Sequence, residues 1–289
     1  MEKKALIMLR VLINRYHKGS TDKILDPLSQ DTMKKVLDQN IRSDDVASAI
    51  KKPERILEKI HYSWMIEPLK KISPLLQPYF LQALSEEKKE YLKQALEQEL
   101  PEIPLSPPVK SFFLEELAKQ MNVHEVIPAS YLPKTPLLPL AYLSKKKLER
   151  VIDLLGIYDL ANEIRQVINK QHLQHLYKCL SKLRLKYLNI VMYLPEKFTH
   201  EKLGIEEYRG DQKRLERVLH KRGLIRLAKA LSGEKQDLLW HINHILDTGR
   251  TTVLQKFSSE KEIPILTQAL IQQTLHALNF MEKEDKNLE

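Results

Sequence analysis

A single cysteine, Cys179, stands among the 289 residues of this chain. One cysteine cannot form an internal disulfide or supply a cysteine-based zinc site, so the disulfide-rich secreted class is excluded. Cys179 lies in an apolar segment with helical spacing, where a small buried residue is the ordinary interpretation. A reducing, cytoplasmic setting fits this composition.

Glycine, aromatic residues and long apolar runs are also scarce. The chain has 7 glycines and 7% aromatic residues, while leucine, lysine, glutamate and glutamine abound. No run approaches the roughly 18 apolar residues that a membrane span requires. In residues 1–16, Arg10 interrupts the apolar side chains, which favours an amphipathic helix over a signal peptide. Because β-branched alternation is nearly absent, the composition predicts an all-α protein.

Catalytic motifs are missing as well. No G-x-G-x-x-G, P-loop or G-x-S-x-G pattern occurs. Asp247-Thr248-Gly249 matches the tripeptide of aspartic proteases, but those enzymes need two copies on strand-flanked turns, and this single copy ends a predicted helix. His241, His244 and Asp247 would offer a metal three ligands from one helical face, but no second element supplies others. We therefore expect no enzyme activity, no cofactor and no metal.

The most informative stretch is residues 223–257. Apolar residues recur there at helical spacing in two blocks, and the second block is predicted to stop at Gly249. Trp240, His244 and Asp247 occupy a different face of that second helix. The helix therefore has two usable sides, as expected inside a stacked array or under a partner.

Helix signals divide the chain into two halves around a proline-rich segment. In residues 1–100, Ser and Pro residues precede short apolar blocks, which predicts short helices that must stack on one another. Residues 101–140 hold eight of the 15 prolines and are predicted to be a linker with one short helix. Residues 141–282 form a second helical domain with an early helix stop at Gly156, and residues 283–289 form a charged tail. We predict a superhelical, armadillo-like array of short helices in two halves.

The formal net charge of +9 points to an acidic protein, anionic lipid or nucleic acid as a partner. Arg214, Arg217 and Lys221 recur along one side of a predicted helix. Such a stripe is compatible with a solvated helix face, with a docking surface for an acidic protein, or with phosphate binding. Few aromatic residues stand beside it and no recognition-helix pattern occurs, so nucleic acid is kept as the alternative partner. The stripe is predicted to continue through Arg222, Arg226 and Lys229.

Two segments resemble components of flagellar-type secretion machinery. Residues 211–257, which contain LxxALSGEKQDLLWHINHILDTGRTTVLQKF, are similar in helix pattern and spacing to the C-terminal region of the flagellar motor-switch protein FliG. HYSWM at residues 61–65 resembles the HPSWL signature of the SctK-type adaptors of type III secretion systems, with tyrosine where that signature has proline. Residues 56–96 also resemble the middle domain of FliG.

The resemblance implies a non-catalytic adaptor that links an inner-membrane ring protein (SctD/FliF-like) to a cytoplasmic ring protein (SctQ/FliM-like). It would be cytoplasmic, peripheral to the inner membrane through these partners alone, and without a small-molecule substrate. FliG alternates acids and bases on its torque helix, whereas residues 249–257 contain no acid, which favours the secretion adaptor. The alternative is a cytoplasmic nucleic-acid-binding helical protein. The predicted partner-binding residues are His61, Tyr62, Ser63, Trp64, Met65, Arg214, Arg217, Lys221, Trp240, His244 and Arg250.

Overall fold

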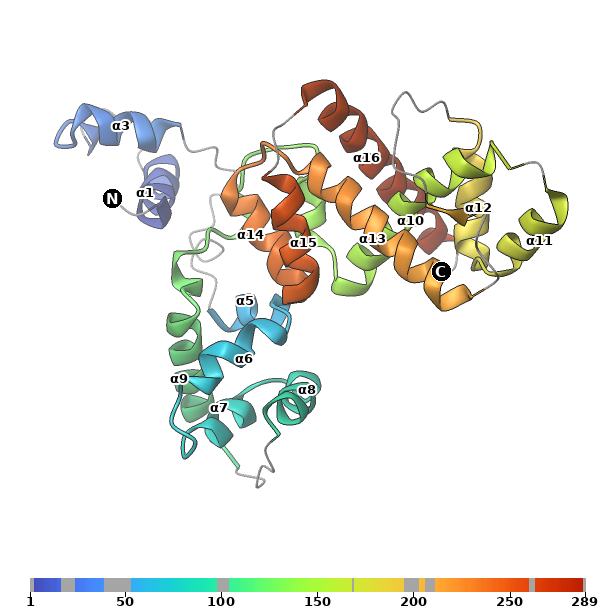
Figure 1. The fold of residues 1–289 in the computed structure, drawn as a ribbon. Coiled ribbons are helices and arrows are strands. Elements are labelled where there is room, and N and C mark those ends of the chain that lie inside the picture. The colour runs from blue at the N-terminus through green and yellow to red at the C-terminus, as the bar shows by residue number, and fades with distance from the viewer. Residues whose placement is uncertain are drawn as a thin grey trace. The chain divides into compact units, whose positions relative to one another are not determined.

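The regular structure of this chain is helical. A computed structural model describes residues 3–16, 24–38, 53–97, 104–167, 169–194, 203–205, 211–259 and 263–287. No strand occurs within these ranges, which confirms the all-α prediction (Figure 1). The scarcity of glycine and the abundance of leucine and lysine favour this outcome. Among the helices of these ranges, none is both long and apolar enough to cross a bilayer.

The chain folds into two compact units. Unit 1 comprises Met1–Ala141 and Gln236–Thr248, and unit 2 comprises Tyr142–Lys235 and Gly249–Glu289. A short segment from late in the sequence thus belongs with the N-terminal unit. Helical periodicity does not reveal that this late segment belongs to unit 1, because periodicity reports only on neighbours along the chain.

The larger part of unit 1 is a cluster of short helices around one hydrophobic core. One helix begins at Pro53 and another follows Ser85, two helix-start residues that the sequence identifies. Leu57, Leu69 and Leu92 are among the buried side chains of this core. The helices are α5 (Pro53–Lys59), α6 (Ser63–Lys70), α7 (Gln77–Ala83), α8 (Glu86–Leu96), α9 (Pro107–Gln120) and α14 (Gln236–Ile245).

Two further helices near the N-terminus share a small core of their own. They are α1 (Lys3–Tyr16) and α3 (Gln30–Leu37). Ser29 caps α3, because its hydroxyl accepts the Thr32 N–H at 3.4 Å. The buried residues of this small core are Leu6, Ile13, Leu25 and Val36.

The proline-rich segment packs within unit 1 over its described part. Leu117 and Ala118 of α9 lie in the core of short helices. Beyond α9, Leu137 and Leu140 are fully buried. Prolines keep this stretch from forming one long helix, and its apolar side chains are nevertheless buried. Three short 3-10 helices occur here: η1 (Val123–Glu125), η2 (Ala129–Tyr131) and η3 (Leu138–Tyr142).

Unit 2 is built on three long helices that pack side by side (Figure 1). Ser144 and Asp211 cap two of them, each accepting a backbone N–H from three residues later. Cys179, expected to be buried in a helix, lies half-buried in a turn. The long helices are α10 (Lys145–Ile164), α13 (Gln212–Ala230) and α16 (Pro264–Lys286), accompanied by α11 (Lys170–Lys178), α12 (Lys182–Val191) and α15 (Thr248–Ser258).

Two glycines let α10 and α13 cross in backbone contact. The predicted helix stop at Gly156 is wrong, because α10 continues through this residue. A Cβ at Gly156 would lie 2.7 Å from the carbonyl carbon of Leu219 and closer still to its oxygen. A Cβ at Gly223 would meet the carbonyl carbon of Ile152 at the same 2.7 Å. Neither position has room for a side chain, so glycine here serves helix packing and not helix termination.

Candidate functional site

Two segments that the sequence singles out meet inside unit 1. The imidazole of His244, on α14, stacks on the ring of Trp240 one turn earlier, with ring centroids 3.9 Å apart. The indole of Trp64, on α6, stacks on the same imidazole at 4.2 Å. We call these three residues the tryptophan–histidine cluster. Its members come from positions 180 residues apart in sequence (from 64 to 244), so only tertiary folding brings them together.

Hydrogen bonds join the start of α6 to the end of α14. The last carbonyl groups of any helix lack donors within that helix and must find them elsewhere. Residues 61–64 supply two donors to carbonyl groups at the end of α14 and one acceptor for the N–H of Thr248, which follows α14. The bonds run from the His61 N–H to the His244 carbonyl (2.7 Å), from Trp64 Nε1 to the Leu246 carbonyl (2.9 Å) and from the Thr248 N–H to the Ser63 hydroxyl (3.1 Å).

Burial sets the protonation state of His244. The loss of hydration lowers its pKa from 6.5 to about 4, and the neighbouring His241 acts in the same direction. The hydrogen bond from Nδ1 to the Trp240 carbonyl, at 2.8 Å, opposes this shift without cancelling it. His244 is therefore neutral near pH 7, and the imidazole stacks against the two indoles without the cost of burying a charge.

The remaining residues of the HYSWM segment also have partners within unit 1. Met65 is fully buried in the core, and Tyr62 stacks on Tyr91 with ring centroids 4.7 Å apart. Trp64 and Trp240 are partly exposed, and both pack against the core. The segment thus has a structural role in docking α14, and its contact with a partner protein stays a prediction.

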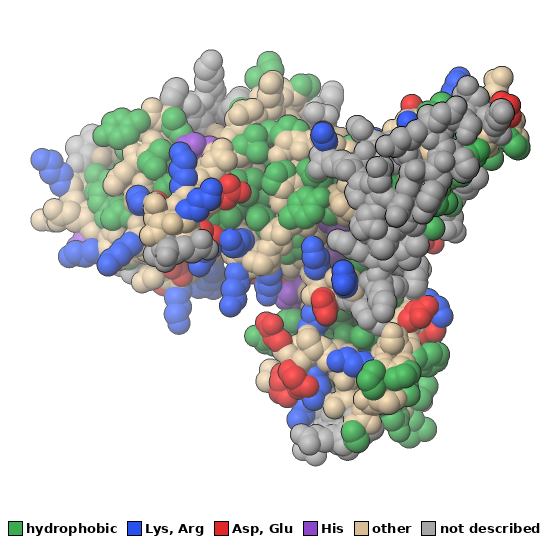
Figure 2. Space-filling view, turned by 180° about the vertical axis from the view of Figure 1, so that it is seen from behind, with side chains coloured by type: hydrophobic (Ala, Val, Ile, Leu, Met, Phe, Trp, Pro, Cys, Tyr) green, Lys and Arg blue, Asp and Glu red, His purple; other side chains and the backbone are tan. Residues whose placement is uncertain are grey.

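The second group of predicted site residues lies on α13. Arg214, Arg217 and Lys221 are exposed, and Lys213 adds a fourth exposed cation to the same helical face. Within the described part of the chain, no ion pair involves any of these four residues, which we call the α13 stripe. Figure 2 shows many Lys and Arg side chains on the displayed face of unit 2, with few acidic side chains among them.

Further along α13, the predicted stripe turns inward. Arg226 is only 3% exposed, and its guanidinium forms an ion pair with Asp159, which is 4% exposed. It also donates to Gln273 Oε1 at 2.6 Å and lies 5.5 Å from the centre of the Tyr158 ring. The prediction of an external stripe through Arg226 is therefore wrong. A buried carboxylate needs a buried cation, and α10 and α16 cover this half of α13.

Arg250 belongs to a charge network that the sequence does not reveal. Its guanidinium lies 3.3 Å from the Glu149 carboxylate, and its Nε donates to His220 Nε2 at 2.8 Å. Because an arginine nitrogen only donates, that imidazole nitrogen is the acceptor and the proton of His220 sits on Nδ1. Nδ1 then donates to Asp153 at 2.7 Å. Arg250 is thus engaged within unit 2, and its contact with a partner stays a prediction.

Asp153 is the centre of this network. Arg184 donates to it at 2.8 Å and also holds Glu216 at 2.8 Å. Burial alone would raise the pKa of Asp153, but the hydrogen bond from His220, together with the charge and hydrogen bond of Arg184, outweighs it and holds the pKa below its usual value. The network joins α10, α12, α13 and α15, whose residues are too far apart in sequence for spacing to suggest it.

The described residues bring together no group of three or more His, Cys, Asp or Glu side chains that could hold a metal. On the helix face considered for a metal, His241 Nε2 lies 2.7 Å from the Ile127 carbonyl and His244 is stacked between aromatic neighbours. The predicted helix stop at Gly249 is wrong, because α15 begins one residue before it. Asp247 therefore stands between two helices, without the strand-flanked turn of an aspartic protease.

Comparison with known proteins gives no family: no protein-family model, no curated protein and no solved structure matches the chain. The resemblances of residues 56–96 and 211–257 to secretion and flagellar proteins therefore stay predictions.

Proposed function

We propose that this chain is a non-catalytic adaptor whose unit 2 docks an acidic surface of a partner protein. The observation that carries the proposal is the α13 stripe, four exposed cations on one helix face with no ion pair in the described residues. Other cations of unit 2, such as Arg184 and Arg226, are engaged by carboxylates. An unpaired basic face adds little to stability but attracts and orients an acidic partner.

Within this class we propose a place at the cytoplasmic face of a type III secretion apparatus. The support is the likeness of HYSWM to the SctK-type signature and of residues 211–257 to FliG. The adaptor would connect an SctD/FliF-like inner-membrane ring protein to an SctQ/FliM-like cytoplasmic ring protein, and would reach the membrane only through the former. Its short helices would stack as an armadillo-like array, with residues 101–140 joining the two halves.

A charge-reversal variant of the α13 stripe tests the proposal. The triple variant Arg214→Glu, Arg217→Glu, Lys221→Glu changes exposed residues only, so the helical circular dichroism should be unchanged. Binding to SctD-like and SctQ-like proteins of the same organism is measured by co-purification and by titration, with nuclease present. We expect binding to one of them, and a loss of at least about 10-fold in affinity for the triple variant, as found for charge pairs at interfaces.

The matched control is Lys170→Glu, Lys178→Glu, Lys182→Glu. These three lysines are also exposed and lie in unit 2, so the control has the same net charge as the test variant. Affinity within about 3-fold of the unaltered chain is expected for the control. An equal loss in both variants would show that only net charge matters, and it would contradict a specific docking face.

The α13 stripe also supports the alternative function, nucleic-acid binding, because exposed cations at this spacing would neutralise phosphates. Four phosphate contacts predict a slope of about −3 to −4 in log affinity against log salt. Tight binding of DNA or RNA with that slope, lost in the triple variant and without binding to any ring protein, would replace the adaptor proposal with the nucleic-acid one.

A further inference from the structure

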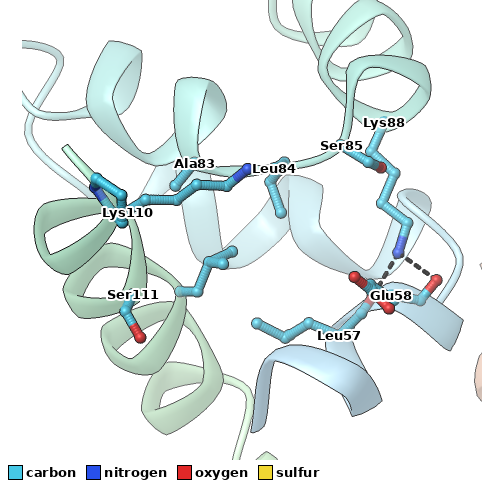
Figure 3. Close-up of a pocket in the computed structure, with 10 residues that line it drawn as sticks. Leu57, Glu58, Ala83, Leu84, Ser85, Lys88, Lys110 and Ser111 are labelled. Atoms are coloured by element: carbon cyan, nitrogen blue, oxygen red, sulfur yellow. Dashed lines mark hydrogen bonds between the residues drawn. The ribbon is translucent and has the colours of Figure 1, made fainter. Parts of the chain in front are cut away.

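Unit 1 contains a pocket that neither the tryptophan–histidine cluster nor the α13 stripe uses. Its volume is about 420 Å³, within the range of cavities that hold small molecules. It opens between the end of α5, the junction of α7 with α8, and the first turns of α9 (Figure 3). The lining residues are Leu57, Glu58, Ala83, Leu84, Ser85, Lys88, Pro107, Lys110, Ser111 and Leu114.

The lining is divided between apolar and basic chemistry. Leu57 and Leu84 are buried and present hydrocarbon to the pocket together with Leu114. Two of the ten lining residues are lysines, and a single one, Glu58, is acidic. An apolar wall beside an excess of positive charge is complementary to a molecule that has a hydrocarbon part and an anionic end.

Lys88 holds a fixed ammonium group at this pocket. Its Nζ donates to the carbonyl groups of Leu57 and of Glu58, the latter at 2.8 Å, so two of its three N–H donors are used (Figure 3). Burial lowers the pKa of Lys88 from 10.5 to about 8, although the charges of Glu58 and Glu87 act in the opposite direction. A buried cation of this kind gains when an anion replaces its lost hydration.

Lys110 supplies a second cation from the opposite wall. Its side chain extends from α9 across the pocket toward Leu84 (Figure 3). Lys110 is exposed, and no ion pair involves it within the described residues. The hydroxyl of Ser85, which precedes α8, makes no capping hydrogen bond and offers a neutral donor nearby.

We propose that this pocket binds an amphiphilic carboxylate, with the carboxylate held by Lys88 and Lys110 and a short hydrocarbon group against the leucines. A free carboxylic acid and the C-terminus of a peptide that ends in an apolar residue share this chemistry. The site is independent of the proposed adaptor function, since it lies in unit 1 and shares no residue with the α13 stripe.

Ligand-observed NMR and calorimetry on the full chain test the site with hexanoate, hexanol and two short peptides that end in leucine, one with a free carboxylate and one amidated. Hexanoate is expected to bind with a Kd on the order of 1 mM, as befits so small a ligand. Hexanol and the amidated peptide should bind at least about 10-fold more weakly. Tighter binding of the free-carboxylate peptide than of hexanoate would identify a peptide terminus as the source, and the reverse would identify a small acid.

Charge variants locate the binding. Lys110→Glu should weaken hexanoate binding at least about 10-fold, whereas Lys71→Glu, an exposed lysine of unit 1 outside the lining, should leave it within about 2-fold. Binding should also weaken as the pH rises above about 8, because Lys88 then loses its charge. Three results would overturn the proposal. They are equal binding of hexanol and hexanoate, no binding of either hexanoate or the free-carboxylate peptide at about 20 mM, and equal effects of the two charge variants on hexanoate binding.

Discussion

The substitution Gly156→Ala has two opposite effects on stability, a gain in helix propensity and a loss of close packing between α10 and α13. Gly156 lies in the interior of α10, and replacing glycine by alanine in a helix interior stabilises an isolated helix by about 1 kcal/mol. In unit 2 the added methyl group would meet the backbone of Leu219 on α13. Backbone cannot rotate away as a flexible side chain can, so the two helices must move apart.

The geometry gives the size of the effect. The new Cβ would lie 2.7 Å from the Leu219 carbonyl carbon, about 0.7 Å short of the 3.4 Å at which ordinary contact begins, and closer still to the oxygen. A separation of that order forfeits a quarter to a half of the attraction between the facing atoms. Overpacking costs typically about 1–3 kcal/mol, and this clash involves rigid backbone on both sides. We expect a packing cost at the upper end of this range, about 3 kcal/mol. The gain of about 1 kcal/mol in helix propensity reduces it to a net loss of about 2 kcal/mol for Gly156→Ala.

Urea unfolding followed by circular dichroism measures this loss as a lower midpoint. Both tryptophans, Trp64 and Trp240, lie in unit 1, so tryptophan fluorescence follows unit 1 in the same experiment while circular dichroism follows both units. Lys146→Ala, at an exposed position of α10, is the control and should change stability by no more than about 0.5 kcal/mol. An unchanged or higher midpoint for Gly156→Ala would refute the close crossing of α10 and α13.

Three further predictions concern the two units separately. The pKa of His244 is about 4 in the folded chain and about 6.5 in the unfolded chain, so the unfolded chain binds more protons between these pH values. The free energy of unfolding should therefore fall by up to about 3 kcal/mol as the pH drops from 6.5 to 4. His244→Gln should flatten this pH dependence in urea midpoints read by tryptophan fluorescence, and an unaltered slope would contradict the prediction. Trp64→Phe keeps an aromatic ring but removes the indole N–H that donates to the Leu246 carbonyl. It should lower the free energy of unfolding by about 1 kcal/mol, measured as a lower urea midpoint, and an unchanged midpoint would show that this bond contributes nothing. Arg226→Met leaves the Asp159 carboxylate buried without its closest cation and should lower the free energy of unfolding by about 3–5 kcal/mol. The double variant Arg226→Met, Asp159→Leu should recover most of this loss in stability. If it does not, packing and not charge dominates at this position.

The elements of this fold were accessible from sequence because their signals are local. Asp211 precedes an apolar repeat, which predicts a helix cap, and its carboxylate does cap α13. Glycine shows the limit of such signals. At Gly156 the same residue type that ends many helices sits inside one, and the deciding fact is the backbone of Leu219, which is 63 residues later in the chain (from 156 to 219).

The candidate sites divide in the same way. Three of the four cations of the α13 stripe were predicted from their spacing along one helix face. The inward turn at Arg226 was not, because it depends on Asp159 on another helix. Trp64 and His244 were each singled out for their chemistry, and no sequence pattern joins them. The pocket at Lys88 has no sequence signal at all, since its lining comes from four helices and the junctions between them.

By itself, the sequence determined that this protein is helical, basic and without a G-x-G-x-x-G, P-loop or G-x-S-x-G motif, because helix propensity, charge and motif spacing depend on near neighbours. Tertiary structure alone decided that Gln236–Thr248 belongs to unit 1, that His244 meets Trp64, and that Gly156 marks a crossing. Each of these depends on which distant segments approach one another, and burial, which only the folded chain defines, then sets the charge of His244 and Lys88.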